Sequence, residues 1–260
     1  MKIERSHGWD VSTAQALDIQ QRLADQVSRA GELAIPRFIG GVDISVEKSR
    51  GIAAAAVVVL SHPELMQVET QVVQGKLEFP YVSGLLSFRE SPLTLAACER
   101  LSIVPDLFLV DGHGIAHPRR MGLAPHLGLF LDTPTIGCAK SRLWGQHTNP
   151  GENTGSYAEL VDRGEVIGAA LRTRCCMKPL YVSIGHKVDL LTAIYWVLEC
   201  CRGYRIPEPI RLAHLAAGGN LKLEKDSLVS GQDTKESFRV EKLPVRINAR
   251  VKGQTKGFTV

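Results

Sequence analysis

The stretch from Leu107 to Arg120 reads LFLVDGHGIAHPRR, and it carries most of the prediction of the fold. Its opening residues are apolar without interruption, which is typical of a strand buried in a sheet. The strand ends at Asp111, and in open α/β sheets the carboxyl ends of the strands face the crevice that binds ligands. Gly112 and Gly114 allow a close approach, because glycine has no Cβ. The histidines and arginines that follow favour an anionic ligand.

Segments on both sides of this stretch predict the rest of a mixed sheet. Residues 38–46, 51–60 and 68–76 are apolar or alternating and are joined by short turns, so they predict an antiparallel meander. Further strands are expected at residues 107–111, 135–139, 166–171 and 180–184, and helices at about 12–27, 91–101, 121–131, 189–201 and 207–218. The predicted fold class is α/β, with one mixed sheet and helices on both faces.

Two local expectations come from prolines and glycines. Ser91 and Pro92 are expected to begin a helix, because proline is favoured at the first helical position. Residues 141–163 are expected to form a loop, because Pro150 and Gly151 interrupt any regular pattern there.

Charge divides the chain into two parts. The chain has 260 residues, 44% of them hydrophobic, which is enough for one domain with a full core. Its net charge of +4 resides in residues 221–260, where nine Lys and Arg face five Asp and Glu. We expect one domain over residues 1–220 and a basic, flexible tail over residues 221–260. Binding of nucleic acid by the domain would therefore need a local basic patch rather than a global field.

The cysteines and the amino terminus favour a cytoplasmic protein. The six cysteines include two vicinal pairs, 175–176 and 200–201, and show neither CxxC nor zinc-finger spacing, so reduced thiols are expected. The first residues lack the apolar centre of a secretory signal. The longest apolar run, residues 51–60, is too short to span a bilayer, so no membrane partner is expected.

Three acids on separate elements are candidates for a shared metal ion. Asp43 lies inside an apolar segment, Asp111 ends a strand, and Glu90 follows the loop that contains Tyr81. Carboxylates gathered without a cation repel one another, whereas their oxygens suit Mg²⁺, which can activate water against a phosphodiester. The alternative is that Asp43 points outward from the sheet. Tyr81, between a proline and a nearby glycine, is either a base-inserting wedge or a loop aromatic packed on its own domain.

Four blocks taken together resemble one family, endonuclease V, the deoxyinosine-directed endonucleases. The blocks are FPYVSGLLSFRE at residues 79–90, VDGHGIAHPRRMGLAPHLG at 110–128, PTIGCAKSRL at 134–143 and RIPEPIRLAH at 205–214. The resemblance runs from about Gly41 to His214. It implies a ribonuclease H-like fold, a catalytic domain over residues 1–220, and hydrolysis that depends on Mg²⁺, with Mn²⁺ as a substitute.

The resemblance also implies roles for individual residues. Asp43, Asp111 and Glu90 match the metal-binding acids, Lys140 matches a lysine near the scissile phosphate, and His214 matches a histidine near the metal.

Recognition of the substrate is expected to fall to a second set of residues. Tyr81 matches the wedge beside the lesion, and Gly84, Gly112 and Gly114 match positions around the pocket for the extruded base. His117 and Arg119 are expected on the phosphate side, with Arg89 and Arg120 completing a phosphate track.

The implied function is cleavage of the second phosphodiester bond 3′ to deoxyinosine in DNA, by a monomer, as the first step of repair. PYVSG at residues 80–84 matches eukaryotic members, which prefer RNA, so an endoribonuclease acting on inosine in RNA is one alternative. The others are a different ribonuclease H-like nuclease and a non-catalytic inosine-binding module. The three acids argue against the module, because a pure binder has no need to gather them beside phosphate.

Overall fold

The structure, a computed structural model, describes residues 1–221 except Lys2, Arg5 and residues 48–50. Residues 1–222 form one compact unit. The predicted tail, apart from Leu221, lies outside the described residues, and its boundary stays a prediction. In the described part of the chain, no helix has the length and apolar character needed to cross a membrane.

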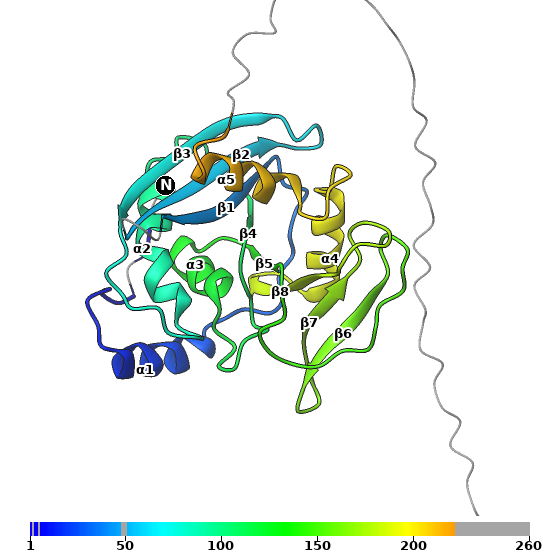
Figure 1. Cartoon of the computed structure of the whole chain (residues 1–260), viewed down its shortest axis with the longest axis horizontal. Coiled ribbons are helices and arrows are strands. Elements are labelled where there is room, and N and C mark those ends of the chain that lie inside the picture. Colours follow the sequence, from blue (N-terminus) through cyan, green and yellow to red (C-terminus); the bar gives the residue numbers. More distant parts are fainter. Residues whose placement is uncertain (2, 5, 48–50, 222–260) are drawn as a thin grey trace, which may run out of the picture. The chain divides into compact units, whose positions relative to one another are not determined.

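One mixed sheet organises the described chain (Figure 1). Its strands are β1 (Phe38–Glu47), β2 (Ile52–Ser61), β3 (Gln67–Lys76), β4 (Leu107–Val110), β5 (Thr135–Ala139), β6 (Tyr157–Asp162), β7 (Glu165–Leu171) and β8 (Leu180–His186). Their order across the sheet is β3-β2-β1-β4-β5-β8-β7-β6. The first three strands form the predicted antiparallel meander, and β4 runs parallel to both β1 and β5. The α/β prediction with a mixed sheet is confirmed.

Helices cover both faces of this sheet (Figure 1). They are α1 (Thr13–Ala24), α2 (Leu86–Glu99), α3 (Leu123–Leu131), α4 (Leu190–Glu199) and α5 (Glu208–Ala217). Alternation along β4 separates the two apolar cores, because successive side chains of a strand point to opposite faces. Leu107 and Leu109 lie in the core that includes α4 and α5. Phe108 and Val110 lie in the core that includes α3 and the later turns of α2.

The start of α2 differs from the prediction. The helix begins at Leu86, so Pro92 lies inside it rather than at its first position. Proline inside a helix costs stability, since it removes a hydrogen bond. Burial of Phe88, which is 1% exposed, favours the earlier start by tertiary packing. As a consequence, Glu90 lies on a helix whose position the core fixes.

The loop expected over residues 141–163 is only partly a loop. Residues 157–162 form β6, which pairs with β7 through a turn at Arg163 and Gly164, both with positive φ. Ala158 and Leu160 are buried, while Tyr157 and Glu159 are exposed. This short alternation is typical of a strand, although it follows a segment rich in prolines and glycines.

Candidate active site

Sheet register brings two of the predicted metal acids together. In the parallel pair of β1 and β4, Val42 is aligned with Val110, and the backbone N–H of Asp111 donates to the carbonyl of Val42 at 2.9 Å. Asp43 and Asp111 follow these aligned residues on strands that lie about 4.8 Å apart. The two carboxylates therefore project from neighbouring positions of the sheet.

The third acid, Glu90, joins them from α2. Burial, together with the charges of Asp43 and Asp111, raises the pKa of Glu90 to about 8. Burial and the charge of Asp111 raise the pKa of Asp43 to about 6. Both side chains are less than a tenth exposed. Asp111 thus lies close enough to disfavour the ionised forms of Asp43 and Glu90, as expected for acids gathered without a cation.

Two basic side chains bond to these acids. Lys140, which follows β5, forms an ion pair with Asp111. The Nδ1 atom of His214 lies 2.6 Å from Oδ2 of Asp43, whose Oδ1 accepts from the backbone N–H of Ile44 at 2.8 Å. Within the described ranges, no three His, Cys, Asp or Glu side chains are arranged as metal ligands. Asp111 bonds to Lys140 and Asp43 bonds to His214 instead.

Gly41 explains how His214 reaches Asp43, although no sequence signal pointed to it. A Cβ on Gly41 would lie 2.0 Å from the carbonyl oxygen of Pro209. The absence of a side chain therefore lets the first turn of α5 pack directly on β1. His214 follows on the same helix and meets Asp43 two residues along the strand.

A cavity of about 260 Å³ lies under the wedge loop, which we define as residues 80–84. Its lining includes His113, two residues after Asp111, and Ser141, which follows Lys140. Tyr81, at its rim, is 76% exposed and available to enter a substrate. The cavity is lined by Gln20, Tyr81, Val82, Ser83, Gly84, Leu86, Ser87, His113, His117, Met121, Gly122, Leu123, Ser141, Arg142 and Leu143.

Gly112 and Gly114, predicted as pocket positions, do not line this cavity. A Cβ on Gly114 would come within 2.1 Å of the carbonyl oxygen of Ile184, so this glycine allows the loop after β4 to pack on β8. A Cβ on Gly112 would touch Leu123. Gly122, which the sequence reasoning missed, does line the cavity, and a side chain there would clash with the carbonyl of His113.

The carbonyl oxygen of Gly84 ties the wedge loop to two other elements. It accepts from Nε2 of Gln20 at 2.9 Å, from Nε2 of His117 at 3.0 Å and from Nη2 of Arg119 at 2.8 Å. Oε1 of Gln20 in turn accepts from Nε of Arg119 at 2.6 Å. We call Gln20, His117 and Arg119 the Gly84 clamp. Gly84 has φ of +78°, a conformation that glycine adopts at no steric cost.

His117 is neutral in this clamp. Its Nε2 must carry the proton, since it faces a carbonyl, and its Nδ1 accepts from the backbone N–H of Arg119 at 3.2 Å. Burial and the charge of Arg119 lower the pKa of His117 to about 3. Both ring nitrogens are therefore engaged within the protein.

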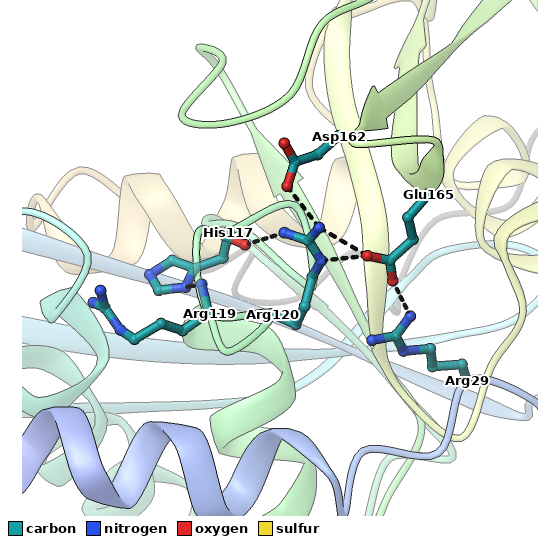
Figure 2. Close-up of polar contacts among 6 residues, drawn as sticks. All are labelled: Arg29, His117, Arg119, Arg120, Asp162 and Glu165. Atoms are coloured by element: carbon teal, nitrogen blue, oxygen red, sulfur yellow. Dashed lines mark hydrogen bonds and ion pairs between the residues drawn. The ribbon is translucent and has the colours of Figure 1, made fainter.

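The three arginines predicted to form a phosphate track, Arg89, Arg119 and Arg120, point in different directions and bond to other parts of the protein. Arg119 points towards α1 and the wedge loop, whereas Arg120 extends towards Asp162 and Glu165 (Figure 2). Arg120 has φ of +56° and pairs with Asp162 and Glu165, each at 2.7 Å. Arg89 donates to the carbonyl of Phe79 at 2.6 Å, at the base of the wedge loop. All three arginines therefore bond to other parts of the protein. The sequence does not show these partners, because they are brought together only by the tertiary fold.

A ribonuclease H-like mixed sheet defines a nuclease when one aspartate lies on β1, a second follows the neighbouring β4, and the loop after β4 lines a cavity. Residues 21–215 match the Endonuclease V family. The chain belongs to the Endonuclease V family, and it is a metal-dependent nuclease that acts on DNA.

Relatives and solved structures agree with this assignment. Endonuclease V of Dehalococcoides mccartyi strain BAV1 is 49% identical over 84% of this chain and 97% of its own. The protein of Gloeobacter violaceus is 52% identical over 80% of this chain and 86% of its own. The crystal structure of Endonuclease V from Bacillus subtilis superposes with a TM-score of 0.81 at 33% identity, covering 84% of this chain and 96% of that one.

One solved relative contains a nucleic acid. Endonuclease V from Ciona intestinalis, in complex with a DNA 24-mer that has an inosine followed by a ribo-adenosine, has a TM-score of 0.68 and 33% identity. The similarity covers 80% of this chain and 96% of that chain.

Proposed function

We propose that this chain is a Mg²⁺-dependent endonuclease that recognises deoxyinosine in DNA and cleaves the second phosphodiester bond 3′ to it, which starts repair. The observation that carries the proposal is the cavity of about 260 Å³, which is lined by His113 from the loop that begins at Asp111 and by the exposed Tyr81. An enzyme that reads a base away from its stack needs such a pocket and a side chain to replace the lost stacking. The Ciona relative with inosine-containing DNA supports the same substrate.

The three acids fit a divalent cation by their chemistry. Carboxylate oxygens are the preferred ligands of Mg²⁺, and burial with mutual repulsion makes the ionised forms of Asp43 and Glu90 costly without a positive partner. Asp43, Asp111 and Glu90 would hold the ion, and Mn²⁺ would substitute for it. When bound, the ion supplies activation of water and stabilisation of the charge on the phosphodiester.

Lys140 and His214 prepare the acids for that role. The ammonium of Lys140 offsets the charge of Asp111 and lies at the strand end where the phosphate would arrive, so it can bind a phosphate oxygen. His214, bonded to Oδ2 of Asp43, fixes the orientation of that carboxylate. The first role is catalytic and the second is positioning.

The cavity would read the base through groups other than the Gly84 carbonyl, which already accepts three hydrogen bonds. Guanine differs from hypoxanthine by one exocyclic amino group. A site without an acceptor for that group rejects guanine, because the buried donor would stay unpaired.

The proposal includes action as a monomer in the cytoplasm. One chain supplies the acids, the cavity and Tyr81, which supports the monomer. Light scattering of the purified protein during turnover would test it. RNA remains a second substrate to compare, since Ser83 stands where bacterial members commonly carry a second wedge proline.

The test is nicking of matched duplexes that carry inosine or guanine at one position, in DNA and in RNA, with Mg²⁺ or with a chelator. We expect a nick in the inosine strand of DNA, at the second bond 3′ to the lesion, only with the metal. Equal cutting of guanine and inosine duplexes would contradict the proposal.

Loss of either aspartate is expected to abolish this nicking. Asp43→Ala and Asp111→Ala should lower the rate by at least about 10³-fold, because each removes a proposed metal ligand. Binding of the inosine duplex, measured by fluorescence anisotropy, should persist. Asp18→Ala, on the exposed face of α1, is the matched control. Full nicking by either active-site variant would contradict the metal assignment.

A further inference from the structure

A second hollow, of about 590 Å³, adjoins the cavity under the wedge loop, which we call the base cavity. The proposed reaction gives this second hollow no role. It is formed by residues 142–146 on one side and residues 161–163 on the other, and we call it the arginine–tryptophan groove. Arg142 and Leu143 line both the groove and the base cavity. The two hollows therefore adjoin along the segment that follows Lys140.

The walls of the groove are held firmly by the backbone. Gln146 and Val161 form an antiparallel bridge with two hydrogen bonds of 2.8 Å. Gly145 has φ of +80°, and a Cβ there would press on Ile167 and Leu160. The chain thus turns at Gly145 immediately after Trp144, and the bridge fixes this turn against β6.

Trp144 presents a fixed aromatic surface in this groove. Its side chain is 37% exposed and bonds to Asp162. An aromatic ring anchored through its N–H and open to solvent is a stacking surface that loses little entropy when a base packs on it.

The charge of the groove is positive. Asp162 is ionised but bonded to Arg120 at 2.7 Å, and Glu165 behind it is paired with both Arg120 and Arg29 (Figure 2). Arg142 and Arg163 are exposed and line the groove, where the charge of Arg163 also acts on Asp162. Asp162 and Glu165 are thus paired with Arg120 and Arg29, while the two guanidinium groups of the groove stay open to solvent.

We propose that the arginine–tryptophan groove binds the single-stranded part of the substrate strand next to the extruded nucleotide, a role that rests on the proposed function. One base would stack on Trp144, and Arg142 and Arg163 would bind the adjoining phosphates. Aromatic platforms with basic side chains are how proteins hold single strands without reading their sequence. The groove would therefore add affinity and fix the path of the strand between the cavity and Lys140, without selecting inosine.

The test uses a probe without inosine, a short thymidine oligonucleotide, so that the groove is measured apart from recognition of the lesion. Of the three tryptophans, Trp144 is the exposed one. Addition of the oligonucleotide should quench the tryptophan fluorescence of the full chain, and Trp144→Phe should abolish the quench while keeping most of the affinity. Trp144→Ala should weaken binding about tenfold, as loss of one stacked base does.

The arginines are tested by the salt dependence of the same binding. Arg142→Ala and Arg163→Ala should each lower the slope of log K against log salt by about 0.7, the value for one phosphate contact on a single strand. Arg174→Ala, an exposed arginine at the other end of the β6–β7 hairpin, is the matched control and should keep the slope.

The outcomes separate this proposal from the proposed function. A full quench in Trp144→Phe, or slopes of both arginine variants equal to that of Arg174→Ala, would overturn the groove even if inosine duplexes are nicked. A lost quench with reduced slopes supports the groove even if the inosine duplex is not cut.

Discussion

Gln20 precedes the stretch that resembles the family, residues 41–214, but it contacts the wedge loop directly. It is 1% exposed, and all polar atoms of its amide are engaged: Nε2 donates to Gly84 and Met121, and Oε1 accepts from Arg119. Its side chain joins α1 to the wedge loop and to the loop after β4. A buried amide with full hydrogen bonding is costly to replace by an apolar group, since its partners then lose their bonds.

Substitution of Gln20 is expected to affect opening of the duplex more than hydrolysis. Gln20→Met removes the hydrogen bond to Gly84 of the wedge loop and the one that holds Arg119 against the same carbonyl. Nicking of an inosine duplex should therefore fall about tenfold more than nicking of a single strand that carries inosine. Initial rates on both substrates measure this ratio. Gln21→Met, exposed on the same helix, should change neither rate. An equal loss on both substrates would show that the clamp does not act through the wedge.

At the scale of elements, the packing of α5 on β1 determines the position of a side chain of the proposed active site. It exists because Gly41 carries no side chain, and it sets His214 against Asp43. A methyl group at this point would meet backbone atoms of Pro209, which cannot rotate away. The helix would have to move as a body.

Gly41→Ala is therefore expected to lower both stability and activity. Overpacking of this kind costs about 1–3 kcal/mol in the free energy of unfolding, measurable by urea denaturation, and the displaced His214 should reduce the nicking rate. Gly8→Ala, where a Cβ meets nothing within 4 Å, is the control. His214→Ala should reduce activity with little loss of stability, because its side chain is largely exposed. Wild-type stability in Gly41→Ala would refute the close contact.

Elements also show how far the sequence could predict the fold and the site. The apolar runs of β1, β2 and β4 and the acids at residues 43 and 111 are visible in the sequence, because burial and register leave a pattern. The start of α2 and the inward course of Arg119 are not visible, because each depends on a tertiary partner that no local pattern shows. Residue roles taken from the resemblance remain predictions.

At the scale of the whole molecule, a buried histidine links the amino terminus to the core. His126 is fully buried, with Nδ1 2.9 Å from the hydroxyl of Ser87 and Nε2 2.8 Å from His7. Burial, helped by His7, lowers the pKa of His126 to about 3. The unfolded chain takes up this proton near pH 6.5, whereas the folded protein does so only near pH 3. The stability that His126 contributes is therefore present above pH 6.5 and is lost as the pH falls towards 3.

His126→Gln should flatten the acid side of the stability profile. Between pH 7 and pH 5 the wild type is expected to lose about 2 kcal/mol more than the variant, which has no such group to protonate. Glu90, with a raised pKa, acts in the opposite direction, but it is present in both proteins and cancels in the comparison. Urea unfolding at several pH values without metal gives the difference. Parallel profiles would mean that His126 titrates normally in the folded protein.

The proposed metal site and the wedge loop are held in place by different kinds of contact. Asp43 and Asp111 stand on neighbouring strands whose spacing the backbone ladder dictates, while Gly84 and the wedge depend on a few side-chain amide and guanidinium contacts. A substitution at Gln20 or Arg119 is thus expected to loosen residues 80–84 while the spacing of the two aspartates stays as the strands set it.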